Sequence, residues 1–281
     1  MSVGVDQART DGEIFLRFVD AHIHLSDEEY AGCIAEIIQE AQMANVVALV
    51  SNSVDLKTSI KSLELAEKYR GLVYAALGIQ PRSVDRLAEG ELETTLDLIS
   101  KQRMNKAMVA IGEIGLDSNH MHSWNDQLKV FDEMLHCAQS LRLPVIIHSR
   151  GAAEQVIERL SSYKLERVLL HFFTGPADAL SKAIEKGYYI SEGPVAVYSE
   201  SIREIVRKVP ITNLLTETDG PVRFYKAPFK GNRTTPAFIP QIVKAIADIK
   251  NTDVQGVAQK IADNFEQFFT LKLGLLGSFS L

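Results

Sequence analysis

Histidine and carboxylate side chains recur along this sequence at the ends of short apolar runs. Five run ends carry six such residues: His22, His24, Glu113, His148, His171 and Asp219. Imidazole and carboxylate groups together suit zinc, manganese, cobalt or iron better than calcium. His22 and His24 form His-x-His at the end of an expected strand, where a period of two puts both rings on one face. Two imidazoles on one face can share a metal ion.

Each residue also has an ordinary interpretation. A lone histidine at a strand end is more often structural than ligating, Glu113 could hold backbone amides, and Asp219 could cap a helix. Six polar groups gathered in one buried place are costly without a compensating ion. We therefore predict a joint metal site. Surface or packing roles are expected for the other three histidines, His120, His122 and His136.

The runs that must position these residues are apolar and β-branched. They begin near residues 14, 46, 72, 107, 144, 167, 187 and 211, at intervals typical of βα units. Helical spacing of apolar residues occupies the stretches between them, and a final helical region is expected over 236–269.

Eight strands alternating with helices predict a (β/α)8 barrel, and a doubly wound open sheet is the competing architecture. About 250 residues is the usual length of such a barrel. We expect residues 1–281 to form a single domain with a core over about 14–270. In such barrels functional side chains stand at the C-terminal mouth, where the six residues would meet.

The composition narrows the class of protein. The chain has 281 residues, 46% hydrophobic and 23% charged, with a net charge of −6. These values argue against disorder, and any phosphate site must be local rather than a general basic surface. There is no run of 18 apolar residues, no hydrophobic signal core within Met1–Glu13, and only two cysteines, Cys33 and Cys137. A cytoplasmic protein with reduced thiols, no membrane association and no obligate protein partner is expected.

The motifs taken together resemble the TatD-type metal-dependent deoxyribonucleases, within the larger group of amidohydrolase-like barrels. The matching pieces are VDAHIHL, GIQP, IGEIGLD, LPVIIHSR, LLHFFTG, TETDGP, GNRTTPAFIP and the closing ADNFEQFF. The resemblance implies a barrel with one or two divalent ions at its mouth. It implies that one ion is held by His22, His24, Glu113 and Asp219. The second would be held by Glu113, His148 and His171, with Glu113 bridging the pair.

The sequence departs from the family where the usual Gly-x-His-Pro reads Gly78-Ile79-Gln80-Pro81. Gln80 can hydrogen-bond to substrate or water but cannot take up a proton as imidazole does. Ser118 also replaces the aromatic residue that usually follows GLD in the family. The segment GNRTTPAF differs from the more common Arg-Asn-Glu-Pro motif.

The chemistry expected from these residues is hydrolysis by a metal-activated water. Two metal ions about 4 Å apart can clamp the attacking and leaving oxygens of an in-line displacement. Asp219 could ligate a metal and accept the proton of the water, with Glu113 as the other catalytic carboxylate. Ligand softness favours zinc or manganese, and the resemblance also allows magnesium.

A basic segment gives an independent indication of phosphate. Between Gly220 and Ala247 there are five basic residues, no acidic one, and four interleaved aromatic residues: Phe224, Tyr225, Phe229 and Phe238. Such a segment suits single-stranded nucleic acid, and a loop whose aromatics cover the barrel is the equal alternative. Arg223 and Arg233 in this segment, and Arg150 after His148, are candidate phosphate ligands.

Three functions are compatible with these residues. The first is a metal-dependent phosphodiesterase on DNA, acting on a single strand or an end as an exodeoxyribonuclease. The second is a small-molecule hydrolase of amides, lactones or phosphate esters. Many such enzymes bridge their metals with a carboxylated lysine, which Glu113 replaces here. The third is a non-catalytic metal-binding or partner-binding protein. We favour the first.

Overall fold

The computed structural model describes residues 16–274. Eight strands alternate with helices in it, and every strand residue is buried. The strands are β1 Phe18–Ile23, β2 Val46–Asn52, β3 Val73–Leu77, β4 Met108–Gly115, β5 Val145–His148, β6 Val168–Leu170, β7 Tyr189–Glu192 and β8 Leu214–Thr216. The helices are α1 Ile34–Met43, α2 Leu56–Lys68, α3 Glu91–Gln102, α4 Trp124–Leu141, α5 Ala153–Leu160, α6 Ala177–Glu185, α7 Glu200–Lys208, α8 Ile239–Lys250 and α9 Val254–Phe269.

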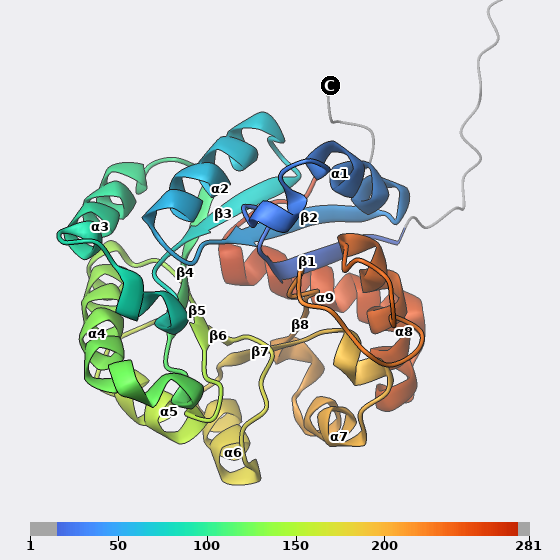
Figure 1. The fold of residues 1–281 in the computed structure, drawn as a ribbon. Coiled ribbons are helices and arrows are strands. Elements are labelled where there is room, and N and C mark those ends of the chain that lie inside the picture. Colours follow the sequence, from blue (N-terminus) through green and yellow to red (C-terminus); the bar gives the residue numbers. More distant parts are fainter. Residues whose placement is uncertain (1–15, 275–281) are drawn as a thin grey trace, which may run out of the picture.

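The strands form one parallel sheet in chain order, from β1 to β8. The sheet closes where β8 returns to β1, because Thr216 Oγ1 donates to the Val19 carbonyl at 2.7 Å and Asp219 N donates to the His22 carbonyl at 2.9 Å. Helices surround the strands on the outside (Figure 1). The (β/α)8 barrel is therefore confirmed, and the doubly wound sheet is excluded.

The element boundaries differ from the sequence expectation in two places. β1 begins at Phe18, and the start expected near residue 14 lies outside the described residues, as do Met1–Glu13. The final helical region is two helices, because Asn251 adopts a left-handed backbone (φ 52°) that ends α8 before α9 begins. Among the helices of residues 16–274, none is long and apolar enough to cross a membrane.

One glycine brings two strand ends of the mouth together. Gly115 pairs with His148 across β4 and β5 and has a φ of +140°. A Cβ atom there would lie 2.0 Å from the His148 carbonyl oxygen. Only glycine allows this approach, which sets His148 beside the end of β4.

Gly115→Ala should therefore lower the free energy of unfolding by at least about 2 kcal/mol, through strained backbone and a clash with β5. Gly32→Ala is the matched control, because a Cβ there meets no atom within 4 Å. Urea unfolding of both variants tests this, and equal midpoints would contradict it.

Candidate metal centre

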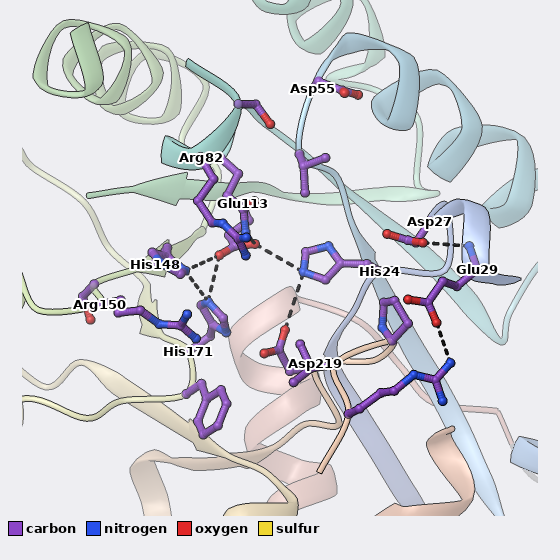
Figure 2. Close-up of a pocket in the computed structure, with 18 of the residues that line it drawn as sticks. His24, Asp27, Glu29, Asp55, Arg82, Glu113, His148, Arg150, His171 and Asp219 are labelled. Atoms are coloured by element: carbon purple, nitrogen blue, oxygen red, sulfur yellow. Dashed lines mark hydrogen bonds and ion pairs between the residues drawn. The ribbon is translucent and has the colours of Figure 1, made fainter. Parts of the chain in front are cut away.

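The six predicted side chains converge at the C-terminal mouth of the barrel. They come from the ends of β1, β4, β5 and β6 and from the residues after β8. Five of these residues are less than 8% exposed, and only His24 is more open. Figure 2 shows five of the six, His24, Glu113, His148, His171 and Asp219, facing one another in the pocket.

Four atoms form a compact cage on the β1 side. His22 Nε2 and His24 Nε2 lie 3.2 Å apart. Their distances to Glu113 Oε2 are 3.7 and 3.4 Å, and their distances to Asp219 Oδ1 are 3.6 and 3.5 Å. Zinc holds nitrogen and oxygen ligands at about 2.0–2.2 Å, so a tetrahedral site has edges of roughly 3.3–3.6 Å. The five separations are therefore close to the edges of a tetrahedral site for a divalent ion.

The other oxygen of Glu113 serves a second set. Glu113 Oε1 lies 2.6 Å from His148 Nδ1 and 2.9 Å from His171 Nε2, and these two nitrogens are 3.3 Å apart. His171 also stacks on His22, with ring centroids 3.8 Å apart. The Glu113 carboxylate thus contacts both ligand sets. Its Oε2 faces the β1-side cage, and its Oε1 faces His148 and His171.

The outer nitrogens of three histidines face acceptors. His24 Nδ1 lies 3.0 Å from the Asn52 carbonyl oxygen, and His148 Nε2 lies 3.1 Å from Asp117 Oδ2. His171 Nδ1 is 3.5 Å from Glu217 Oε1. For His24 and His148, the hydrogen bond at the outer nitrogen fixes the tautomer that leaves the inner lone pair free for a metal.

Asp117 and Glu217 were not singled out from the sequence, although they lie in the motifs IGEIGLD and TETD. The sequence signal that could have identified them is their position next to strand ends that carry predicted metal ligands. Their role as acceptors depends on side-chain direction, which periodicity does not give.

The pKa values of the cluster are set by its burial and by the contacts between the Glu113 carboxylate and the histidine rings. Burial alone would raise the pKa of Glu113, but His171 and His148 outweigh it and hold the pKa well below its usual range. Burial would lower the pKa of His171, yet Glu113 and Glu217 raise it well above normal. Burial, with His171 nearby, lowers the pKa of His22, which keeps that ring in the neutral form that binds metals.

The predicted substrate-binding residues divide into two groups. Gln80, Arg150 and Arg223 line the cavity above the cluster, which has a volume of about 640 Å³. Gln80 Nε2 donates to Glu113 Oε2 at 2.7 Å, and Arg223 Nη2 donates to Glu29 Oε2 at 2.8 Å. Arg233 does not line the cavity, because its guanidinium lies against α1, where Nη1 is 3.0 Å from Cys33 Sγ.

Two cavity cations were missed from the sequence, Arg82 and Arg86 of the short 3₁₀ helix Pro81–Arg86. Neither Arg82 nor Arg150 forms an ion pair through its side chain within residues 16–274. The remaining histidines agree with prediction. His122 bonds Asp85 on the surface, His136 packs on Tyr163, and none of the three lines the cavity.

Comparison with known proteins gives the family. The family described as "TatD related DNase" matches residues 19–270. The chain belongs to the TatD family. It is accordingly a metal-dependent hydrolase, and the family and the cluster together indicate a divalent metal ion.

Three similar proteins illustrate the TatD relationship. "Uncharacterized metal-dependent hydrolase YabD" of Bacillus subtilis is 30% identical over 90% of this chain and 98% of its own. "3'-5' ssDNA/RNA exonuclease TatD" of Erwinia tasmaniensis is 29% identical, over 90% and 99%. The crystal structure of YjjV, a TatD homolog from Escherichia coli, is 27% identical with a TM-score of 0.85, covering 92% and 99%.

The cage geometry leads to a test of binding. His24→Ala should reduce the metal retained after dialysis by about one ion per chain, because it removes one corner of the β1-side cage. It should also shrink the rise in melting temperature on adding zinc or manganese. His122→Ala is the control, being an exposed histidine outside the cavity. Elemental analysis that finds unchanged metal in His24→Ala would contradict the assignment.

Proposed function

We propose that this protein is a metal-dependent phosphodiesterase that cleaves DNA at a single-stranded end, using a metal-activated water. The observation that carries the proposal is Glu113, one carboxylate in contact with both ligand sets, beneath Arg82 and Arg150, which form no ion pair within residues 16–274. The family and the name of the Erwinia tasmaniensis relative support it.

The ligand assignment follows the two sets. His22, His24, Glu113 and Asp219 would hold one ion, and Glu113, His148 and His171 the other. Zinc, manganese and magnesium are the candidates. When bound, such ions neutralise phosphate charge and lower the pKa of a water molecule toward neutrality.

The chain's own residues then supply positioning and proton transfer. Asp219 lines the cavity and lies at its floor, so its carboxylate can accept the proton of the attacking water. Gln80 holds Glu113 through a hydrogen bond and cannot itself take up a proton.

One side of the cavity carries two carboxylates, which favours a strand end over a long duplex. In the view of Figure 2, Arg150 lies on the His148 side, and Asp27 and Glu29 lie on the His24 side, where Arg223 pairs with Glu29 and leaves Asp27 as the main acidic charge. Guanidinium groups can grip a phosphate, whereas carboxylates repel a backbone that continues past them.

Wild-type protein with manganese, magnesium or zinc should shorten single-stranded DNA progressively, and EDTA should abolish this. Glu113→Gln should lower kcat by at least about 100-fold, because both ligand sets lose a charged oxygen. Glu64→Gln, on the exposed face of α2, controls for the same chemical change. Labelling each DNA end in turn gives the polarity. Activity that survives EDTA or Glu113→Gln would contradict the proposal, and turnover of an amide or lactone instead would favour the small-molecule alternative.

The free guanidiniums give a second prediction. Arg82→Ala and Arg150→Ala should each raise the KM for DNA about tenfold, as expected for a charge-assisted phosphate contact. Each should also weaken the salt dependence of binding. Arg103→Ala is the control, because Arg103 precedes β4 and lies at the opposite end of the barrel. Unchanged KM values would assign the phosphate contact elsewhere.

A further inference from the structure

The loop that follows β8 separates its aromatic residues into two kinds. Phe224 and Phe229 are buried, and the Phe229 ring packs 4.6 Å from Phe238. Tyr225, the residue next to Phe224, is 81% exposed. Most of the aromatic residues therefore cover the barrel, and one of them projects into solvent.

This loop is held in place beside the metal centre. Val222 N donates to the Asp219 carbonyl at 3.0 Å, and Thr234 Oγ1 donates to the Val222 carbonyl. Tyr30 OH, itself buried, donates to the Thr234 carbonyl at 2.5 Å. The segment that carries Tyr225 is thus tied to the proposed ligand Asp219 and to the buried Tyr30.

Tyr225 lines the same cavity as the metal cluster, together with Pro221 and the exposed Val222. The rest of the cavity lining is largely charged or polar. Pro221, Val222 and Tyr225 form an apolar ledge within it. An exposed aromatic ring on a fixed loop is a stacking surface that tolerates any base.

We propose that this ledge binds an unpaired nucleobase of the substrate, with Tyr225 stacking on it while the adjacent phosphate occupies the metal centre. The inference rests on the proposed function and names its substrate class. The substrate is a nucleotide at a strand end whose base is free to stack, rather than a phosphate ester in general. A base inside a duplex is stacked on both faces and does not present a face to the ring.

The experiment compares two single-stranded oligonucleotides of one sequence. One carries normal bases throughout, and the other carries abasic residues at both ends. Tyr225→Ala should raise the KM for the normal strand about tenfold and leave kcat within twofold, since stacking contributes to binding and not to bond cleavage. The same variant should leave both constants for the abasic-ended strand unchanged, and Tyr225→Phe should behave as wild type.

A binding measurement separates failure of this inference from failure of the proposed function. Oligonucleotides ending in 2-aminopurine should lose fluorescence on binding to Glu113→Gln, and the loss should be absent when Tyr225→Ala is added. Quenching without cleavage by wild type would overturn the proposed function alone. Cleavage without quenching, or equal effects of Tyr225→Ala on both strands, would overturn the stacking site. Because Tyr225 is exposed, melting temperatures of the variants should match wild type.

Discussion

The carboxylate of Glu113 is fully buried at the centre of the barrel mouth, and the surrounding side chains are arranged to satisfy it. An unpaired charge there would cost several kcal/mol. His148 and His171 contact one oxygen, Gln80 donates to the other, and His24 lies 3.4 Å from that same oxygen. A parallel barrel makes this possible, because the C-terminal ends of all its strands meet in one place. The same convergence that offsets the buried charge leaves nitrogen lone pairs facing inward, which is the arrangement a divalent cation needs.

The loops around the mouth add cationic and aromatic side chains to the cavity. The short helix after β3 contributes Arg82 and Arg86, the turn after β5 contributes Arg150, and the loop after β8 contributes Tyr225. Within residues 16–274, Arg82 and Arg150 have no ion-pair partner, whereas Arg86 lies 3.6 Å from Asp85 and Arg223 is paired with Glu29. A rigid centre built on strand ends and a substrate surface built on loops fit a hydrolase whose substrate preference can vary around a constant chemistry.

The sequence predicted the barrel and the gathering of the six strand-end residues well, because strand periodicity and strand ends determine both. It was a poor guide to where the side chains of loop residues lie. Arg233 and Arg223 belong to one basic segment, yet one packs against α1 and the other lines the cavity. The same segment buries Phe224 and exposes Tyr225. Asp117 and Glu217 support histidines through contacts between neighbouring strand ends, which a single sequence does not reveal. In each case the location of the side chain depends on the backbone path of a loop or on the direction of the side chain. Neither property follows a periodic pattern in the sequence.

The most direct test of the account is the position of bound metal. Crystals grown with manganese or zinc, measured at the absorption edge of the ion, should give two anomalous peaks in the barrel mouth. One peak should lie within ligand distance of His22, His24, Glu113 and Asp219. The other should lie within ligand distance of Glu113, His148 and His171, so that Glu113 contacts both. Peaks away from Glu113, or none at saturating metal, would contradict the claim that this buried carboxylate organises the site.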